Sequence, residues 1–338
     1  MNISSNFSLK PYNTFGINAQ AKLFTTIKQV DDIRELLQTN EYKTNSHLIL
    51  GGGSNMLFTK NVDGLVIKNE LKGIEIVKEQ GDDVYVKCAG GEVWHEFVMW
   101  TIDHNLCGLE NLSLIPGCTG ASPMQNIGAY GVEIKDNFHE LEAVHTSTGE
   151  IKVFTKTECE FGYRESVFKR KLKDQFIITS VTFKLSKTPK FNIEYGAIKQ
   201  ELDNMKISDL SIKAISQAVI NIRSSKLPNP KELGNAGSFF KNPEVSANNY
   251  NLLKADFPHI VAYSLDNGNY KLAAGWLIEQ SGLKGYRAGD AGVHKLQALV
   301  LVNYGNASGK EIYDLSTHVL TTVKQKFGVD LEREVNII

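Results

Sequence analysis

The chain has 338 residues, more than one compact core usually holds, so two or three domains are expected. Its 37 Lys and Arg residues are balanced by 38 Asp and Glu residues, and the formal net charge of −1 excludes the basic surface typical of nucleic-acid-binding proteins. The first residues lack the apolar stretch of a signal peptide, and no apolar run approaches the roughly 20 residues of a membrane span. We therefore expect a soluble, cytoplasmic protein that binds neither nucleic acid nor membrane.

The N-terminal region predicts a small α/β unit. A helix is expected over 30–37 (VDDIRELL), with Asp at its N-cap and Ile33, Leu36 and Leu37 on one face. A short buried strand over 48–50 runs into a glycine-rich loop, and a second strand over 64–68 follows.

From about residue 73 the pattern changes to alternating strands and hairpins. Strands are predicted at 74–77, 84–88, 141–144, 151–154 and 176–185. A helix is predicted over 93–104, with Val93, Phe97 and Trp100 on one stripe. The stretch 109–132 is rich in Gly, Ser, Pro and Asn, and a loop of this length usually carries function.

The C-terminal third mixes helices, loops and strands. A helix over 211–222 is followed by a Pro-containing break at 226–230, which is the best candidate for a domain boundary. A glycine-rich loop (233–243), a helix closed by Gly282 (272–280), a strand (298–303) and a last helix (309–327) are expected in that order. Hairpins mixed with helices favour an α+β fold.

Cysteine and histidine patterns argue against a metal site. Cys88, Cys107, Cys118 and Cys159 form no C-x-x-C pair, so we expect four reduced, mostly buried thiols. His95 is not followed four residues later by a second His, since that position is Met99, which excludes a zinc-protease helix. His294 is interpreted as a buried histidine with satisfied hydrogen bonds beside Lys295.

Two loops have the composition of a phosphate or dinucleotide site. Three glycines at 51–53 follow a strand, and such a loop lets successive N–H groups approach an anion closely. The loop matches neither the G-x-G-x-x-G motif nor a P-loop. The alternative to phosphate binding is therefore that the glycines are an ordinary cluster at a turn after a strand. The loop 115–131 contains hydroxyls, two side-chain amides and an aromatic ring, which suit a pyrophosphate and a ring system. The alternative is a purely structural role as a buried meander with tight turns.

Two further residues stand out by their local sequence. Arg164, two residues after a Gly, is suited to holding a carboxylate bidentately, although a surface ion pair is the commoner role of a single Arg. Ser238 lies between Gly237 and two Phe residues, but no G-x-S-x-G elbow surrounds it. Taken alone, Ser238 is most simply a turn residue.

Taken together, these segments closely resemble the UDP-N-acetylenolpyruvoylglucosamine reductase family of peptidoglycan-precursor flavoenzymes. The matching stretches cover nearly the whole chain in the family's order: 13–16, 51–55 (GGGSN), 115–133, 161–168 (FGYRESVF), 234–243 (GNAGSFFKNP) and 274–303. The segment 193–197, around Tyr195, resembles the extra loop of the longer form of the family.

The resemblance implies an α+β fold made of a two-part FAD-binding domain of the vanillyl-alcohol-oxidase type and a smaller α+β substrate-binding domain. The expected boundaries are 1–70 and 71–222 for the two FAD lobes, 223–326 for the substrate domain, and 327–338 for a C-terminal segment that returns to the active site. Non-covalent FAD, NADPH as the reductant, an enolpyruvyl UDP-sugar as the substrate and a monomeric state are expected.

The resemblance also implies roles for individual residues. Ser238 is expected to donate a proton, Arg164 to hold the substrate carboxylate, and Glu334 to share a hydrogen bond with it. Glu332 competes for the last role, and we choose Glu334 because Val335 follows it. The expected cofactor-binding residues are Gly51, Gly52, Gly53, Ser54, Asn55, Gly117, Gly120, Ser122, Gln125, Asn126 and Tyr130, and the expected substrate-binding residues are Tyr195, Lys226, Asn242 and Gln297.

Two other functions remain open from the sequence. A flavin oxidase on the same cradle would pass electrons to oxygen, but would have no evident use for Arg164 or Ser238. A non-catalytic nucleotide-binding module would take up no FAD.

Overall fold

The computed structural model describes residues 2–338, and the chain divides into two compact units. Unit 1 consists of Met1–Phe7, Ala21–Gly52 and Asp63–Ser225, and unit 2 of Ser8–Gln20, Gly53–Val62 and Lys226–Ile338. The chain therefore passes finally into unit 2 after Ser225, close to the boundary expected after residue 222. Two short N-terminal segments also belong to unit 2, because they pair with C-terminal residues: Asn235 donates its N–H to the Thr14 oxygen, for example.

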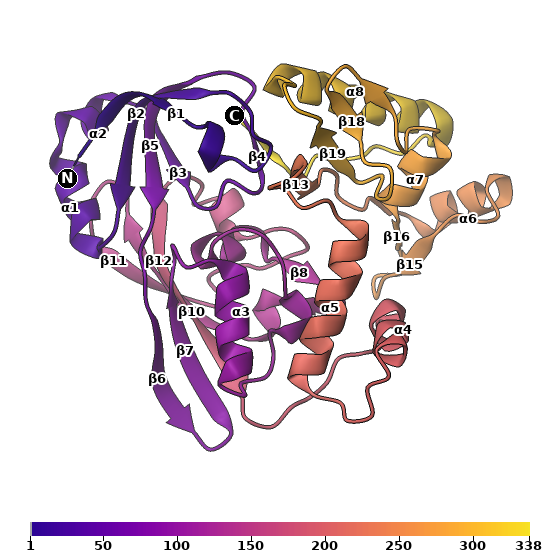
Figure 1. The fold of residues 1–338 in the computed structure, drawn as a ribbon, viewed down its shortest axis with the longest axis horizontal. Helices are drawn as coiled ribbons and strands as arrows, with labels where there is room; N and C mark the ends of the chain where they lie inside the picture. Colours follow the sequence, from indigo (N-terminus) through magenta and orange to yellow (C-terminus); the bar gives the residue numbers. More distant parts are fainter. Residues whose placement is uncertain (1) are drawn as a thin grey trace. The chain divides into compact units, whose positions relative to one another are not determined.

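The first sheet of unit 1 has the strand order β1-β2-β5-β3 (Figure 1). Its strands are β1 (Ser4–Ser8), β2 (Gln20–Ile27), β3 (His47–Leu50) and β5 (Val62–Asn69), and helices α1 (Val30–Gln38) and α2 (Asn40–Thr44) precede β3. The two predicted strands at 48–50 and 64–68 are confirmed, and the structure pairs β3 with β5 in parallel. The predicted Asp N-cap of α1 is wrong: Gln29 is the N-cap, and the Asp32 carboxylate accepts its N–H in a capping box.

The second sheet of unit 1 is antiparallel, with the strand order β11-β10-β12-β7-β6. All five strands were predicted and are confirmed: β6 (Ile74–Gln80), β7 (Asp83–Ala89), β10 (Phe138–His145), β11 (Ile151–Thr155) and β12 (Phe176–Ser186). Between β7 and β10 the chain forms helix α3 (Trp94–Asp103) and the short strands β8 (Gly128–Ala129) and β9 (Val132–Glu133).

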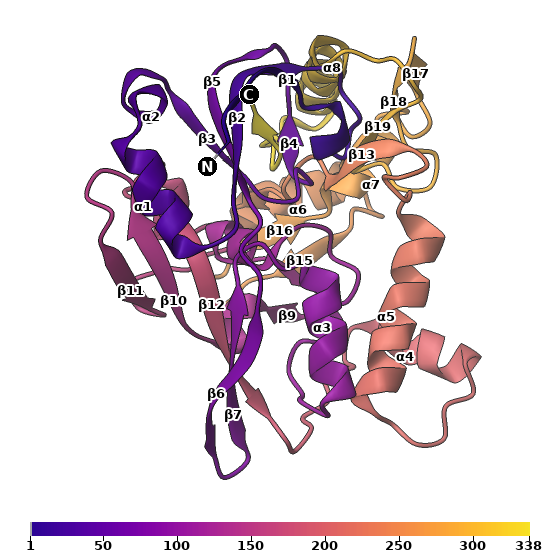
Figure 2. The ribbon, with the colours of Figure 1, turned by 60° about the vertical axis from the view of Figure 1, so that its left-hand side comes forward.

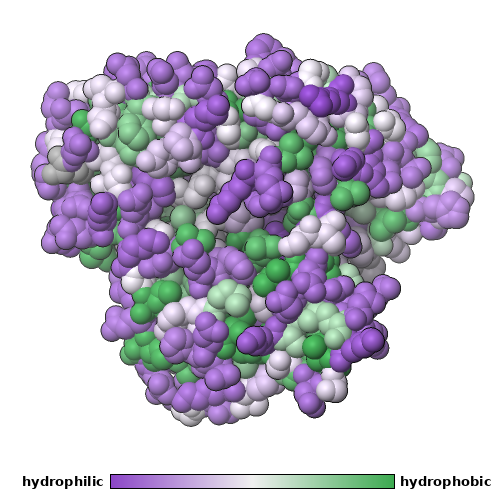
Figure 3. Space-filling model, viewed as in Figure 1, coloured by the Kyte–Doolittle hydropathy of each residue, from purple (hydrophilic) through white to green (hydrophobic). Residues whose placement is uncertain are grey.

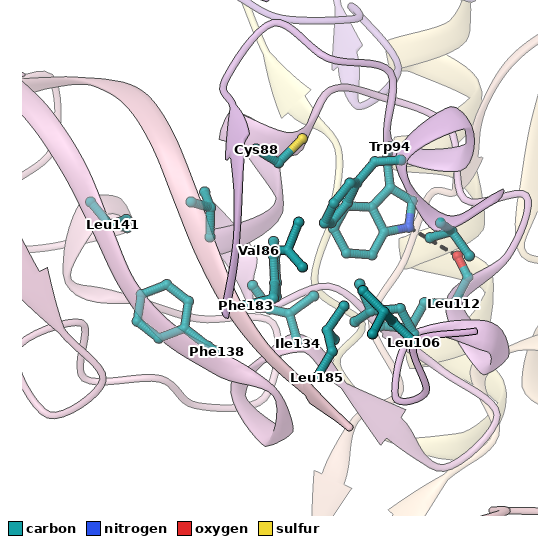
Figure 4. Packing of buried hydrophobic residues seen from close by; sticks show 14 of the residues in the cluster. Val86, Cys88, Trp94, Leu106, Leu112, Ile134, Phe138, Leu141, Phe183 and Leu185 are labelled. Atoms are coloured by element: carbon teal, nitrogen blue, oxygen red, sulfur yellow. Dashed lines mark hydrogen bonds between the residues drawn. The ribbon is translucent and has the colours of Figure 1, made fainter. Parts of the chain in front are cut away.

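Aromatic packing joins α3 to this sheet (Figure 4). The Trp94 ring lies edge-on to Phe183 at 5.7 Å, and the Trp94 indole N–H donates to the Leu112 oxygen at 2.9 Å. The predicted stripe that included Val93 is wrong, because Val93 is the extended N-cap and is 37% exposed. The helix begins one residue later, so its buried face starts from Trp94 and Phe97.

Two further helices complete unit 1. Helices α4 (Gly196–Asn204) and α5 (Ile212–Lys226) lie side by side in Figures 1 and 2 and share a small core of Ile198, Leu202, Ile215 and Val219. The predicted helix end at residue 222 is wrong by one turn, because α5 continues to Lys226.

Unit 2 contains two small sheets and three helices. The sheets have the strand orders β13-β19-β18-β17 and β14-β16-β15. Helix α6 (Ala247–Asp256) lies between β14 and β15, α7 (Ala274–Gln280) between β16 and β17, and α8 (Gly309–Phe327) after β19. The strands are β13 (Gly234–Ser238), β14 (Glu244–Val245), β15 (Ala262–Ser264), β16 (Tyr270–Leu272), β17 (Arg287–Ala288), β18 (Ala291–Val293) and β19 (Val300–Asn303). A parallel pair of β4 (Met56–Leu57) and β20 (Asn336–Ile337) ties the C-terminus to an early segment.

Unit 2 gives two corrections to the predicted elements. The helix predicted over 272–280 begins at Ala274, because Tyr270–Leu272 forms strand β16. The predicted loop over 233–243 begins as strand β13, which pairs with β19. Gly, Asn and Ala have low strand propensity, so the pairing depends on the apolar partner strand. The last helix is confirmed at Gly309–Phe327, with the Ser308–Glu311 capping box at its start and Gly328 at its end.

Polar residues predominate on the face shown in Figure 3, with apolar residues interspersed. Within residues 2–338, no helix combines the length and apolar character of a membrane span. Over the same residues, no three His, Cys, Asp or Glu side chains are grouped so as to hold a metal ion. The four cysteines are free and buried, as predicted.

Candidate active site

The two predicted glycine loops touch each other within unit 1. A Cβ atom added to Gly52 would lie 2.9 Å from the Cα atom of Gly117, and one added to Gly51 would lie 3.7 Å from the Cβ atom of Cys118. A Cβ on Gly120 would lie 2.9 Å from the Gly90 oxygen. Three backbone segments therefore meet where side chains have no room, so the close packing of these loops requires glycine at Gly52 and Gly120.

The first loop continues into unit 2 at Gly53. Gly53 has a φ of +62°, and its Cβ would lie 2.0 Å from the Tyr12 oxygen. Its own carbonyl accepts the N–H of Thr14 at 3.1 Å. Only glycine fits this position, because both the dihedral angle and the space exclude a side chain.

Two predicted cofactor residues instead shape the second loop. The Ser122 hydroxyl donates to the Thr119 oxygen at 2.7 Å. The fully buried Asn126 amide donates to the Glu133 carboxylate at 2.9 Å and to the Gly162 oxygen at 3.0 Å. Both amide hydrogens of Asn126 are thereby used, so its contact with a cofactor stays a prediction.

Arg164 is held in a strained turn of unit 1. Gly162 and Glu165 exchange backbone hydrogen bonds, and Arg164 between them has a φ of +54°. One guanidinium nitrogen donates to the Gly128 oxygen at 2.6 Å. A non-glycine residue in the left-handed region costs about 1–3 kcal/mol, and such strain often marks a functional position.

A cation that the sequence reading missed lies behind the second loop. Arg223, on the last turns of α5, donates to the Leu114 oxygen at 3.2 Å and hydrogen-bonds to Tyr130. Burial lowers the pKa of the Arg223 guanidinium and raises the pKa of the Tyr130 phenol. Tyr195 lies edge-on to Tyr130 at 5.4 Å, so the structure brings two predicted site residues together around this arginine. In the sequence, the only feature that points to Arg223 is its position three residues before Lys226.

In unit 2, the structure brings Ser238 and Glu334 to neighbouring backbone positions. The Glu334 N–H donates to the oxygen of Phe239, the residue after Ser238, at 2.8 Å. Lys241 donates its N–H to the Glu332 oxygen, and Phe240 bridges to Arg333, so the two segments run antiparallel. Ser238 lies at the end of β13, while Phe239 and Phe240 are buried.

The two competing acids differ in their surroundings. The Glu332 side chain is 71% exposed and forms an ion pair with the Lys241 ammonium group at 2.5 Å. The Lys241 side chain is only 12% exposed, and the choice of Glu334 over Glu332 stays a prediction.

Two predicted substrate-binding residues meet at the start of α7. The Asn242 side-chain oxygen accepts the Ala274 N–H at 3.0 Å. A Cβ on Gly275 would lie 3.3 Å from the Gln297 side-chain oxygen. Lys226, the third such residue, is the last residue of α5.

The predicted environment of His294 is wrong. Its side chain is 6% exposed, and Nδ1 is buried without a hydrogen-bond partner among residues 2–338. Burial, followed by the charge of Lys295, lowers the pKa of this imidazole.

Comparison with known proteins identifies the family. A Flavobacterium johnsoniae protein named UDP-N-acetylenolpyruvoylglucosamine reductase is 56% identical, with 100% of both chains covered. Proteins of the same name from Pseudomonas syringae pv. syringae and Amoebophilus asiaticus are 50% and 49% identical, cover 99% and 100% of their own lengths, and match all of this chain. The chain belongs to the UDP-N-acetylenolpyruvoylglucosamine reductase family. The expected resemblance is therefore confirmed.

Domain and fold comparisons agree with this family. Residues 229–338 match its C-terminal domain, and residues 21–155 match an FAD binding domain. The crystal structure of UDP-N-acetylenolpyruvylglucosamine reductase (MurB) from Thermus caldophilus shares the fold, with a TM-score of 0.69 at 24% identity over 99% of this chain and 98% of that chain. The expected α+β fold with an FAD-binding domain is confirmed. The FAD-binding match contains both glycine loops.

Proposed function

We propose that this chain reduces UDP-N-acetylglucosamine enolpyruvate to UDP-N-acetylmuramate, with non-covalent FAD as the cofactor and NADPH as the reductant. The observation that carries the proposal is the full-length identity of 56% with a relative named for this reductase activity. We place the reaction in cytoplasmic peptidoglycan precursor synthesis and take the active species to be a monomer. The reaction reduces a carbon–carbon double bond, which makes the protein an oxidoreductase.

When bound, FAD supplies the hydride, which comes from NADPH. The protein contributes position and charge. Gly51, Gly52 and the second loop form the main-chain cradle for the cofactor pyrophosphate, and Arg223 places a fixed positive charge beside Tyr130 of that loop.

Arg164 holds the substrate carboxylate. Negative charge develops on this carboxylate and on the neighbouring carbon during hydride addition, and a planar guanidinium stabilises it bidentately. The hydrogen bond to the Gly128 oxygen and the fixed turn orient the Arg164 fork before the substrate binds, which supports this role.

Ser238 and Glu334 complete the reaction. The Ser238 hydroxyl donates the proton that forms the lactyl ether, and Glu334, in its protonated form, shares a hydrogen bond with the substrate carboxylate. A hydroxyl is a weak acid, so Lys226 or a water chain must stabilise the transient alkoxide. The backbone hydrogen bond between Glu334 and Phe239 brings the two segments that carry Ser238 and Glu334 together, which supports this proposal.

Two half-reactions test this function. Purified protein is expected to carry the visible spectrum of bound FAD, to be bleached anaerobically by NADPH, and to be reoxidised by the enolpyruvyl nucleotide. Much faster reoxidation by air than by this nucleotide would indicate an oxidase instead. A colourless protein that takes up no FAD would indicate a nucleotide-binding module.

A further inference from the structure

The C-terminal end of the chain is fastened to residues 55–59. The Asn336 N–H donates to the Asn55 oxygen at 3.1 Å, and the Ile338 N–H donates to the Leu57 oxygen at 2.9 Å. Thr59 donates to the terminal Ile338 oxygen twice, from its N–H at 2.8 Å and from its hydroxyl at 2.7 Å. This contact therefore holds Ile338 by both its N–H and its backbone oxygen.

Glu334 lies inside the same contact. The Asn55 side-chain amide donates to the Glu334 oxygen at 3.3 Å, and the Asn336 side-chain amide donates to the Asn55 oxygen at 2.9 Å. The Glu334 N–H is meanwhile held by the Phe239 oxygen. The backbone of Glu334 is thus held from both sides, by the residue after Ser238 and by the segment that follows the three glycines.

We propose that Asn55 and Thr59 are positioning residues that set the place of Glu334 through the C-terminal strand. The inference rests on the proposed function, in which Glu334 acts on the substrate. A side chain is only as well placed as its backbone, and a displacement of about 1 Å at a catalytic group can cost about 100-fold in rate. The residues after Glu334 therefore serve the second half-reaction by holding the Glu334 backbone in place.

Asn55 connects the proposed cofactor loop to the C-terminal strand. Asn55 ends the GGGSN loop that is proposed to cradle the cofactor, and the same residue supports Glu334. Because Asn55 has been placed at the cofactor, its substitution would affect both half-reactions. Thr59, four residues further along, contacts Ile338 and provides the cleaner test.

The main test compares Thr59→Val with Thr59→Ser. Valine keeps the shape of threonine but removes the hydroxyl donor, whereas serine keeps the donor. We expect Thr59→Val to leave flavin reduction by NADPH unchanged and to slow reoxidation by the enolpyruvyl nucleotide by about 10-fold, with Thr59→Ser restoring the rate. Thr322→Val is the matched control, because the Thr322 hydroxyl donates only to its own helix at His318.

Coupling to Glu334 separates positioning from general destabilisation. If Thr59 acts through Glu334, Thr59→Val should add no further loss of rate in a Glu334→Gln background. Deletion of Ile337 and Ile338 should reproduce the effect, because it removes the Ile338 oxygen that accepts from Thr59. Hydrogen exchange at the Glu334 amide should accelerate in both variants.

The outcomes distinguish the two proposals. If the wild-type protein cannot be reoxidised by the enolpyruvyl nucleotide, the proposed function itself fails. If the wild type turns over but Thr59→Val and the deletion keep its reoxidation rate and its Glu334 exchange rate, the positioning inference is overturned. Fully additive losses in the double variant would also overturn it.

Discussion

The N–H of Glu334 donates a 2.8 Å hydrogen bond to the oxygen of Phe239, the residue that directly follows Ser238. These two segments are about a hundred residues apart in the chain, so the contact is a product of the fold. It places two proposed catalytic residues at adjacent backbone positions in unit 2. From its local sequence alone, Ser238 resembles a turn residue. Its closeness to Glu334 in the fold is what suggests a catalytic role.

Substitution of Ser238 by alanine should separate the two half-reactions. NADPH should reduce the flavin at the wild-type rate, because no proton from Ser238 is needed in that step. Reoxidation by the enolpyruvyl nucleotide should slow by at least about 100-fold. Stopped-flow absorbance of the flavin measures both rates, and unchanged single-turnover reoxidation would remove Ser238 from the chemistry.

Replacing Arg164 by lysine keeps the charge but removes the planar fork. The loss of one charge-assisted hydrogen bond to the developing charge should lower kcat by about 10-fold or more. Arg170→Lys is a suitable control, since Arg170 lies six residues later in an exposed ion pair with Glu160. Wild-type kcat in the Arg164 variant, measured by NADPH consumption, would refute a bidentate role.

Gly52→Ala should reduce FAD binding. The new Cβ would lie 2.9 Å from the Cα atom of Gly117, and since this Cα is a backbone atom that no rotamer change can move, one of the two loops must shift. Overpacking of this kind costs about 1–3 kcal/mol. The ratio of flavin to protein absorbance after gel filtration measures the effect. Gly196→Ala should retain the full cofactor, because its Cβ meets no atom within 4 Å; equal flavin content in the two variants would contradict the cradle.

Local signals in the sequence predicted much of the fold. Helix α8 was predicted with its observed bounds, and the structure shows a Ser308–Glu311 capping box at its start and left-handed Gly328 at its end. The five strands of the antiparallel sheet were found because their apolar residues alternate. Strand β13 was missed because its Gly, Asn and Ala residues form a strand only beside β19.

The candidate site was predicted as separate pieces. Both glycine loops were recognised from their composition, but the contact of Gly52 with Gly117 depends on long-range packing. The same limit applies to Thr59 and Ile338, which are joined across nearly the whole chain. Arg223 was missed because a single arginine near a helix end carries no pattern, and only its burial beside Tyr130 distinguishes it.

His294 should make the stability of the protein depend on pH. Burial lowers its pKa in the folded state, so between the folded and unfolded values the unfolded chain binds the proton more readily. The contribution of neutral His294 to the free energy of unfolding is fully present above the unfolded-state pKa of about 6.5. As the pH falls below this value, the contribution is lost with a limiting slope of about 1.4 kcal/mol per pH unit. His294→Phe removes this titration without leaving a cavity, and Nδ1 has no partner to lose among residues 2–338. The free energy of unfolding of the wild type, measured with urea, should therefore fall relative to the variant between pH 7 and pH 5. Parallel stability curves for the two proteins over this range would show that His294 is protonated equally in both states.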